Sequence, residues 1–190
     1  MTPMSDDEVW LVRHGETEWS RNGRHTSTTD LPLTAEGRRV AETLRDRLDH
    51  DSFALVLTSP RERARETARL TGHGEAAVDD DLAEWDYGEL EGRTTPQIRE
   101  TYPDWSIWEG PVPGGESAAQ VSERLDRVVA RCREAAGPVL LFGHGHSLRA
   151  LAARWLDLPV AEGRHLKLDT STLSVLGWER ETPVVLRWNA

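Results

Sequence analysis

Two short apolar runs, each leading into a histidine, constrain the fold of this chain more than any other feature of its sequence. The first covers residues 9–12 and is followed by Arg13 and His14; the second covers residues 139–142 and is followed, after one glycine, by His144. Continuous apolar runs of this length are typical of parallel strands that are buried on both faces. Ligands bind beyond the carboxyl ends of such strands, so we expect the two imidazoles to meet at one edge of a sheet.

Strand and helix patterns alternate along the chain, which predicts an α/β fold with a largely parallel sheet. The expected strands are residues 9–13, 54–57, 139–142, 173–177 and 184–188. A chain of 190 residues can bury a substantial core without disulfides or metals. We therefore expect a single domain over residues 1–190.

Local patterns mark where the first helices begin. Thr34 is the expected N-cap of a helix whose buried face is spaced at Val40, Leu44 and Leu48. Pro60 follows the second strand and is expected in the first turn of the next helix.

A capping box of Ser117 and Gln120 predicts the start of a later, longer helix. Its buried face is expected at Val121, Leu125, Val128, Val129 and Cys132. Ahead of it, residues 105–115 combine two tryptophans with several glycines and prolines, which predicts an irregular flap. A last helix is expected over residues 147–156.

Composition excludes several classes of partner. The formal net charge of -10 argues against nucleic acid, which requires a broad basic surface. Cys132 is the single cysteine, so a disulfide framework is excluded, and no apolar run approaches membrane-spanning length. We expect a cytoplasmic protein without nucleic-acid or membrane partners, and leave a homodimer open.

The residue types at the strand ends suit phosphoryl transfer, which needs a nucleophile, cationic groups for the phosphoryl oxygens and an acid for the leaving oxygen. His14 and Arg13 provide the first two at one strand end. Four arginines lie between residues 61 and 69, and one of them at the helix start could clamp a phosphate. Glu84 has aromatic neighbours that would raise its pKa toward the range of a general acid.

The order of these residues resembles the histidine phosphatase superfamily, the phosphoglycerate mutase-like proteins, from residue 9 to about residue 176. Residues 13–17 read Arg-His-Gly-Glu-Thr, which matches the family signature. The resemblance implies a three-layer α/β/α fold of the phosphoglycerate mutase type. It also implies that His14 becomes phosphorylated and that Arg13 binds the phosphoryl oxygens.

Three further segments match family motifs. The Ser-Pro-x-x-Arg-Ala pattern aligns Arg63, and not Arg61, with the family's second phosphate-binding arginine. The Glu-x-x-x-Gly-x-x-Glu-Gly pattern starts at Glu84, which the resemblance therefore implies is the acid. The second family histidine lies in a His-Gly pair and matches His144.

The resemblance further implies that residues 20–30 line the phosphate pocket and that Gly145 contributes to it. Within the loop, Ser20 and Thr26 are the expected phosphate-binding residues. The chain departs from many relatives here, because Ser20 and Ser27 stand where asparagine and glycine are common.

The run at residues 83–100 is similar to the branch of small acid phosphatases and fungal sedoheptulose 1,7-bisphosphatases. The implied function is a cofactor-free and metal-free phosphomonoesterase. Its expected partners are small phosphorylated substrates, with sugar phosphates or bisphosphates favoured. In this interpretation a protonated His144, together with Arg13 and Arg63, stabilises the transferring charge.

A phosphoglycerate mutase is the first alternative function. A mutase needs a lid that keeps water from the phosphohistidine, and the chain between the acid and the second histidine leaves little material for one. Residues 105–115 also contain no Lys or Arg for a substrate carboxylate.

Two alternatives come from other classes. In a metal-dependent hydrolase, the His-x-His pair formed by His144 and His146 would be completed by Asp30, Asp86 and His14. The fixed cation beside His14 argues against this site. A catalytically silent phosphate-binding module is the other alternative, but binding alone would not require an acid. The resemblance assigns no role to His25 or His146. Both are expected to be loop histidines, with a supporting or substrate contact left open for His146.

Overall fold

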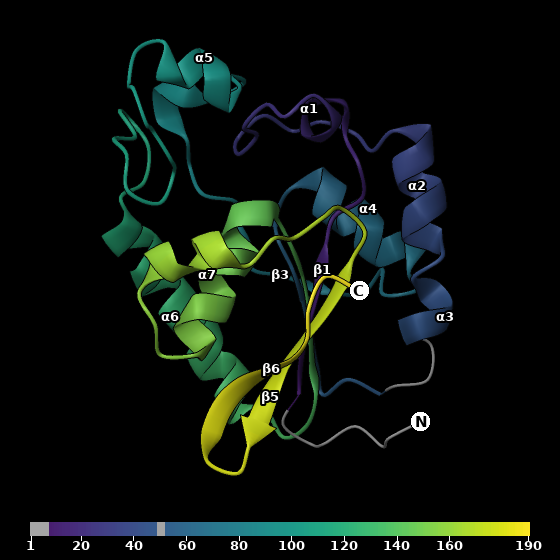
Figure 1. Ribbon diagram of the computed structural model, residues 1–190. Helices are drawn as coiled ribbons and strands as arrows, with labels where there is room; N and C mark the ends of the chain where they lie inside the picture. Colours follow the sequence, from purple (N-terminus) through teal and green to yellow (C-terminus); the bar gives the residue numbers. More distant parts are fainter. Residues whose placement is uncertain (1–7, 49–51) are drawn as a thin grey trace.

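The computed structural model describes residues 8–48 and 52–190. Its centre is a six-stranded sheet with the order β3-β2-β4-β1-β5-β6 (Figure 1). The strands are β1 (Val9–Arg13), β2 (Leu55–Thr58), β3 (Ala77–Val78), β4 (Val139–Gly143), β5 (Leu173–Glu179) and β6 (Thr182–Arg187). β3, β2, β4 and β1 run parallel to one another, whereas β5 pairs antiparallel with β1 and β6 antiparallel with β5. The largely parallel sheet is therefore confirmed, with an antiparallel pair of strands at one side.

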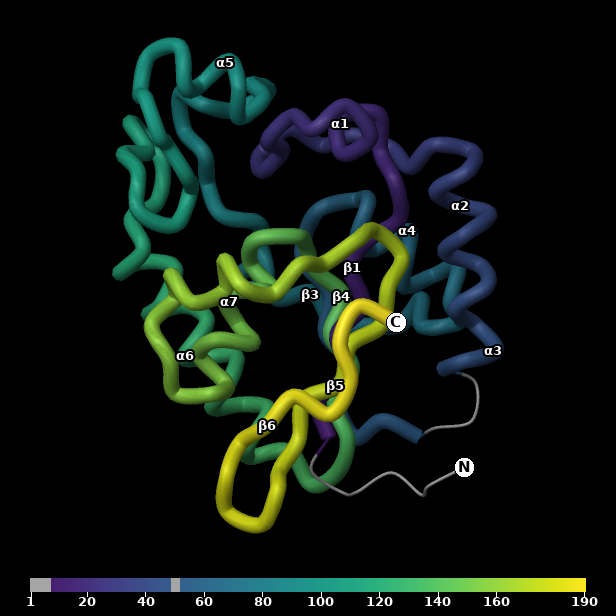
Figure 2. The backbone as a smooth tube through the Cα atoms, in the orientation of Figure 1, coloured from purple at the N-terminus to yellow at the C-terminus, as the bar shows by residue number. Residues whose placement is uncertain are grey.

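Helices cover both faces of this sheet. The helices of the described residues are α1 (Glu18–Arg21), α2 (Ala35–Glu42), α3 (Arg45–Leu48), α4 (Glu62–Leu70), α5 (Thr95–Arg99), α6 (Ala118–Glu134) and α7 (Gly145–Trp155), of which α1 and α5 lie beyond the end of the sheet. Figures 1 and 2 show α2, α3 and α4 on one side of the strands and α6 and α7 on the other. The expected three-layer arrangement is confirmed. No helix in the described ranges is long and apolar enough to cross a membrane.

The two faces of the sheet separate the apolar residues of each strand. Side chains alternate between faces along a strand, so neighbouring residues enter different clusters. Leu11 and Leu141 belong to the cluster that includes residues of α6 and α7. Val12 and Phe142 belong to the cluster on the side of α2, α3 and α4. This burial on both faces explains why the strands read as continuous apolar runs.

The helix that begins after Thr34 is shorter than expected. Thr34 caps α2 as predicted, but α2 ends at Glu42 and a separate turn, α3, follows. The Thr43 hydroxyl donates a hydrogen bond to the Val40 carbonyl, and a side chain that bonds its local backbone in this way competes with continuation of the helix. Leu44 is buried as expected, whereas Val40 is only partly buried.

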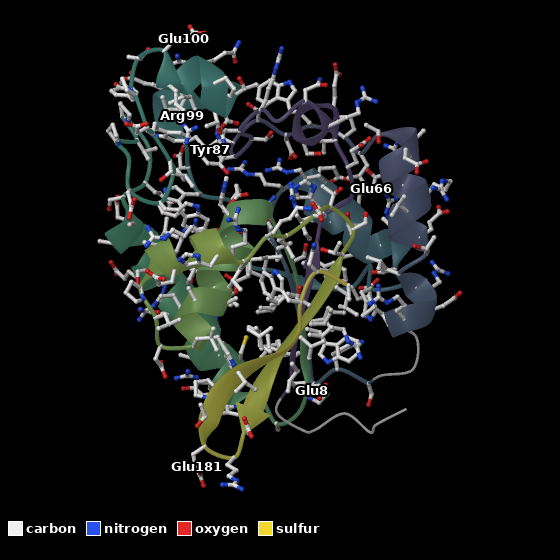
Figure 3. All side chains as sticks on the ribbon, in the orientation of Figure 1. Glu8, Glu66, Tyr87, Arg99, Glu100 and Glu181 are labelled. Atoms are coloured by element: carbon white, nitrogen blue, oxygen red, sulfur yellow. The ribbon has the colours of Figure 1, made fainter. Side chains whose placement is uncertain are left out.

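Polar contacts join the elements on this face. Arg38 of α2 donates a hydrogen bond from Nε to Oε1 of Glu66 on α4 at 2.7 Å (Figure 3). The expectation for Pro60 is wrong: α4 begins at Glu62 with Arg61 as its N-cap, so the proline lies in the preceding turn.

Residues 105–115 are irregular, as expected, and two buried tryptophans hold them against the core. Trp105 and Trp108 are both buried, and the Trp105 indole donates a hydrogen bond to the Pro111 carbonyl at 2.9 Å. Trp108 packs edge to face against Trp85, with ring centroids 5.8 Å apart. Large aromatic rings stabilise through buried area, and here that burial fixes the segment against the core.

The long helix α6 agrees with its expected pattern. Ser117 and Gln120 form a capping box, and all five residues of the expected buried face are buried. Cys132 lies on this face, and burial raises the pKa of its thiol to about 12. A thiol in this environment behaves as a small core side chain rather than a nucleophile.

Candidate active site

The carboxyl ends of β1 and β4 lie next to each other. Arg13 pairs with Gly143 in the parallel ladder, and the next amide, His14 N–H, donates to the Gly143 carbonyl at 3.0 Å. The rings of His14 and His144 follow directly, with centroids 5.1 Å apart. The two imidazoles therefore meet at one edge of the sheet, as the two apolar runs predict.

The hydrogen bond at Nδ1 determines the tautomer of His14. Nδ1 lies 2.7 Å from the carbonyl oxygen of Gly15, and a carbonyl only accepts, so Nδ1 carries the proton. Burial, followed by the charges of Arg63 and Arg13, lowers the pKa of His14 well below its usual value. The ring is therefore neutral, and its Nε2 keeps a free lone pair, which is the form a nucleophile requires.

Two helices hold the loop that carries His14. The Gly15 N–H donates to Thr67 Oγ1 of α4 at 3.0 Å. On the other side, Gly15 lies against Gly37 of α2: a Cβ at position 15 would be 2.8 Å from the Gly37 carbonyl oxygen. A Cβ at position 37 would be 2.3 Å from the Glu16 carbonyl oxygen. The loop and α2 thus touch through backbone atoms, which leaves no room for a side chain at either glycine.

His144 is also neutral, which corrects the expectation of a protonated ring. Its Nδ1 accepts a hydrogen bond from Arg63 Nε at 3.2 Å, and its Nε2 lies 2.6 Å from Ser59 Oγ. A guanidinium only donates, so the remaining proton lies on Nε2 and points to Ser59. Burial, then Arg63, His14 and Arg13, lowers the pKa of His144 well below its usual value.

Arg63 lies behind the pocket, where it holds the loop that forms one wall. Its side chain is fully buried and donates to the backbone carbonyls of Thr26, Ser27 and Thr29 as well as to His144. These hydrogen bonds pair the guanidinium N–H groups with acceptors of the protein itself. Arg63 is thus adjacent to the site but is not among the residues that line it.

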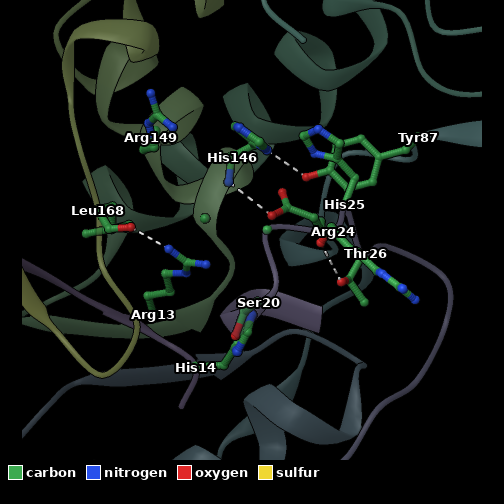
Figure 4. A pocket seen from close by; sticks show the side chains of 13 residues that line it. Arg13, His14, Ser20, Arg24, His25, Thr26, Tyr87, His146, Arg149 and Leu168 are labelled. Carbon is green, nitrogen blue, oxygen red and sulfur yellow. Dashed lines mark hydrogen bonds between the residues drawn. The ribbon is translucent and has the colours of Figure 1, made fainter. Parts of the chain in front are cut away.

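Arg13 does line the pocket (Figure 4). One of its terminal nitrogens donates to the Leu168 carbonyl, while its Nε is buried without a partner among the described residues. Buried polar groups are almost always paired, so an orphaned guanidinium N–H beside a nucleophile indicates where an anionic ligand binds.

Glu84 lies at the amino end of α7. Its Oε1 accepts hydrogen bonds from the Trp85 and Ser147 amides at 2.8 and 2.7 Å, and its Oε2 accepts from the His146 amide at 3.0 Å. All three amides donate to the carboxyl oxygens, and two of them lie at the positive end of a helix. Hydrogen-bond donors, rather than the aromatic neighbours, thus dominate its surroundings.

The loop residues expected to bind phosphate line the pocket, but their hydroxyls have partners. Ser20 Oγ accepts from the Thr17 amide and donates to the Thr17 carbonyl, completing the cap of α1. Thr26 Oγ1 donates to the Arg24 carbonyl at 3.1 Å. Gly145 also lines the pocket, and a Cβ there would lie 3.2 Å from Cζ of Arg13.

Several lining residues have no assigned role in the sequence interpretation. His25 and His146 both face the pocket, and so does Tyr87, whose hydroxyl lies 2.6 Å from His146 Nδ1 (Figure 4). Burial lowers the pKa of His25 to about 4. Both histidines thus lie in the pocket, and a substrate contact by His146 stays a prediction. In the sequence, His146 could be found as the second histidine of the His-x-His pair, and Tyr87 as a tyrosine three positions after Glu84.

Two further arginines contribute to the lining. Arg149 lies over the Trp108 ring at 4.8 Å and donates to the carbonyls of Gly163 and Arg164. Arg24 lies on the opposite loop. Within the part of the chain that the structure describes, neither forms an ion pair with a carboxylate. The pocket is therefore strongly cationic in a chain of negative net charge.

The residues considered for a metal site do not assemble. Asp30 accepts a hydrogen bond from the Glu62 amide at the start of α4, and Asp86 accepts one from the Gly88 amide. Across residues 8–48 and 52–190, no three His, Cys, Asp or Glu side chains are arranged to hold a metal ion.

Comparisons with known proteins agree with this geometry. Residues 9–190 match the family model of the histidine phosphatase superfamily, branch 1. An acid phosphatase of Mycobacterium tuberculosis is 47% identical over 174 residues, which are 89% of this chain and 85% of the relative. The sedoheptulose 1,7-bisphosphatase of Saccharomyces cerevisiae is 37% identical over 183 residues, covering 79% of this chain and 68% of the relative.

A solved structure shares the whole architecture. The product of an open reading frame of Mycobacterium tuberculosis superposes with a TM-score of 0.92 at 41% identity, covering 97% of this chain and 98% of that chain. The family model, the two phosphatase relatives and the neutral histidine beside a cationic pocket all agree. This chain belongs to branch 1 of the histidine phosphatase superfamily and is a phosphoric monoester hydrolase.

Proposed function

We propose that this enzyme hydrolyses phosphate monoesters of small metabolites by phosphorylating His14 on Nε2, and that sugar bisphosphates are its preferred substrates. The observation that carries the mechanism is the tautomer of His14. The Gly15 carbonyl holds the proton on Nδ1, burial keeps the ring neutral with Nε2 free, and Arg13, whose Nε–H has no partner among the described residues, lines the same pocket.

In the first step, Arg13 binds oxygens of the phosphoryl group and Nε2 of His14 attacks phosphorus. The bond from phosphorus to the ester oxygen breaks, and a proton from the Glu84 carboxyl group goes to that oxygen. The alcohol leaves and phosphohistidine remains.

In the second step, the Glu84 carboxylate removes a proton from water, and the water oxygen attacks phosphorus. The bond from Nε2 to phosphorus breaks, inorganic phosphate leaves, and Glu84 is again protonated for the next cycle. Arg63 and His144 support this chemistry from behind by holding the loop and each other. The same two residues, His14 and Glu84, thus act in both halves.

Two pocket arginines that form no ion pair within the described residues support the choice of substrate class. A single phosphoryl group is matched by Arg13 at the nucleophile, yet Arg24 and Arg149 add two more guanidinium groups to the same pocket. Figure 4 shows Arg149 and Arg13 on one side of the pocket, opposite Tyr87 and His25. A second anionic group on the substrate would satisfy the extra cations, and the name of the yeast relative supports the same class.

The substrate assignment is tested by pairing bisphosphates with their monophosphates. Arg149→Met should lower kcat/KM for a sugar bisphosphate about tenfold to hundredfold, as expected for lost charge-assisted hydrogen bonds, and leave the monophosphate nearly unchanged. Arg154→Met is the matched control, since Arg154 lies on the same helix but pairs with Asp126 outside the pocket. Equal losses on both substrates would contradict the assignment.

Hydrolysis rather than mutase activity is supported by residues 105–115. They are packed against the core through Trp105 and Trp108, so they provide no mobile lid over His14. Incubation with 3-phosphoglycerate and a trace of 2,3-bisphosphoglycerate, and separately with sugar phosphates, should release phosphate from the sugar phosphates without isomerising the phosphoglycerate. Isomerisation that outpaces phosphate release would favour the mutase.

A further inference from the structure

The orientation of the Arg13 guanidinium depends on one backbone carbonyl. Its single hydrogen bond to the described chain is donated to Leu168 O, and its Nε has no partner. A long, flexible side chain held at one point can rotate away from its ligand unless that point is fixed. Whatever fixes the Leu168 carbonyl therefore fixes the phosphoryl-binding arginine.

Leu168 lies in an irregular segment, residues 166–172, that has no helix or strand pattern of its own. At one end, the Ser171 amide donates to the carbonyls of Arg13 and His14 and ties the segment to the end of β1. At the other end, the contacts come from the residues after β6. The Trp188 indole donates a hydrogen bond to the Lys167 carbonyl.

Asn189 holds the residue next to Leu168 through two hydrogen bonds. Its Oδ1 accepts from the Asp169 amide at 2.7 Å, and its Nδ2 donates to Asp169 Oδ2 at 2.9 Å. Its own amide donates to Ser174 Oγ of β5 at 3.0 Å, so this pair of hydrogen bonds between Asn189 and Asp169, here called the clamp, is anchored on the sheet. The backbone of Asn189 is left-handed, with φ of 54°, a conformation in which asparagine is one of the few favoured residues.

We propose that Asn189 is a positioning residue for phosphate binding. Its hydrogen bonds hold Asp169 against the sheet and so fix the neighbouring Leu168 carbonyl. That carbonyl in turn orients the Arg13 guanidinium toward the pocket. The proposal rests on the proposed role of Arg13 and adds a residue that does not line the pocket. Outer groups of this kind hold reacting or binding groups to a fraction of an ångström, and their loss costs about tenfold to hundredfold in affinity.

The first test removes the hydrogen bonds of the Asn189 side chain without straining the backbone. Glycine adopts the left-handed conformation freely, so Asn189→Gly removes the side chain alone. Inorganic phosphate and orthovanadate should bind about tenfold more weakly by calorimetry, and KM should rise more than kcat falls. Arg180→Gly is the matched control, because Arg180 is also left-handed, with φ of 56°, but lies in the exposed turn between β5 and β6.

The second test asks whether Asn189 acts through Arg13. In an Arg13→Lys background, which keeps a cation but loses the guanidinium fork, Asn189→Gly should have little further effect on phosphate affinity. Equal effects of Asn189→Gly in both backgrounds would overturn the proposal, as would a loss of affinity no larger than that of Arg180→Gly.

The third test separates hydrogen bonding from charge. Asp169→Asn keeps the backbone amide and an oxygen that can accept from Asn189 Nδ2, so it should retain most of the phosphate affinity. A loss as large as that of Asn189→Gly would mean that the Asp169 charge, and not the clamp, matters. Phosphate binding requires no turnover, so the measured affinities test the role of Asn189 independently of whether sugar phosphates are substrates.

Discussion

Glu84→Gln tests the chemical role of the carboxyl group most directly, because the structure separates its chemical effect from its structural one. A glutamine oxygen can keep the two amides that bond Oε1, but the new NH₂ group then faces the His146 N–H, donor against donor. One buried amide loses its acceptor, which costs about 1–3 kcal/mol of stability. For a chain of this size each kcal/mol lowers Tm by about 2–4 °C.

The chemical effect should be larger and selective. Loss of general acid catalysis costs about 10²–10⁴-fold in the first chemical step, equivalent to about 3–5.5 kcal/mol in the barrier. This loss applies to sugar phosphates, whose alkoxide leaving groups need a proton. It hardly applies to p-nitrophenyl phosphate, whose leaving group is stable as an anion. The second step is common to both substrates, so the first step is compared through kcat/KM. The ratio of the two kcat/KM values should fall by about 10²–10⁴, which a change in stability alone cannot produce.

The assay compares steady-state turnover of both substrates with Tm measured on the same samples. Glu91→Gln is the matched control, since the Glu91 carboxylate also accepts hydrogen bonds from backbone amides, those of Ser27 and Thr29, but does not line the pocket. It should lose stability to a similar degree while changing both substrates by the same factor. Equal losses in kcat/KM on the two substrates for Glu84→Gln would refute the general-acid assignment.

Four further predictions concern the nucleophile, the charges, and the pH dependence of activity and of stability. His14→Ala should abolish turnover and the label trapped on protein by alkaline rapid quench; appreciable residual turnover would contradict a phosphohistidine. Activity should persist in excess EDTA, because arginines and not a metal meet the phosphoryl charge; loss restored by zinc or manganese would show the opposite. Since burial and two arginines lower the pKa of His14, kcat/KM should stay level as the pH falls through about 6.5, and half-loss there would refute a neutral nucleophile. The lowered pKa values of His14 and His25 mean that the unfolded chain binds more protons below about pH 6.5, so Tm should fall with acidification.

The strands and the meeting of the two histidines were predictable because both follow from local patterns. A parallel strand buried on both faces reads as an apolar run, and its carboxyl end is the place for a ligand. The protonation of His144 was not predictable in this way. It depends on Arg63 and Ser59, which lie 81 and 85 positions away in the chain and meet the ring only after folding.

The surroundings of Glu84 and of residues 105–115 show the same limit. The aromatic neighbours of Glu84 in sequence suggest a dry pocket, but the amides of a helix 62 and 63 positions later provide its contacts. Likewise, glycine and proline near Trp105 and Trp108 predict irregular backbone correctly. Whether such backbone is mobile depends on where the indoles are buried, which is decided by tertiary packing.

The contact between Gly15 and Gly37 has a consequence for the substitutions that the chain tolerates. Position 37 lies in a helix that carries no catalytic group, and its backbone does not require glycine for conformational reasons. Yet any Cβ there would meet the Glu16 carbonyl oxygen, one peptide unit beyond the loop glycine that fixes the tautomer of His14. In a saturation scan, position 37 should therefore show the intolerance of a reactive position, although no atom of its residue approaches the substrate.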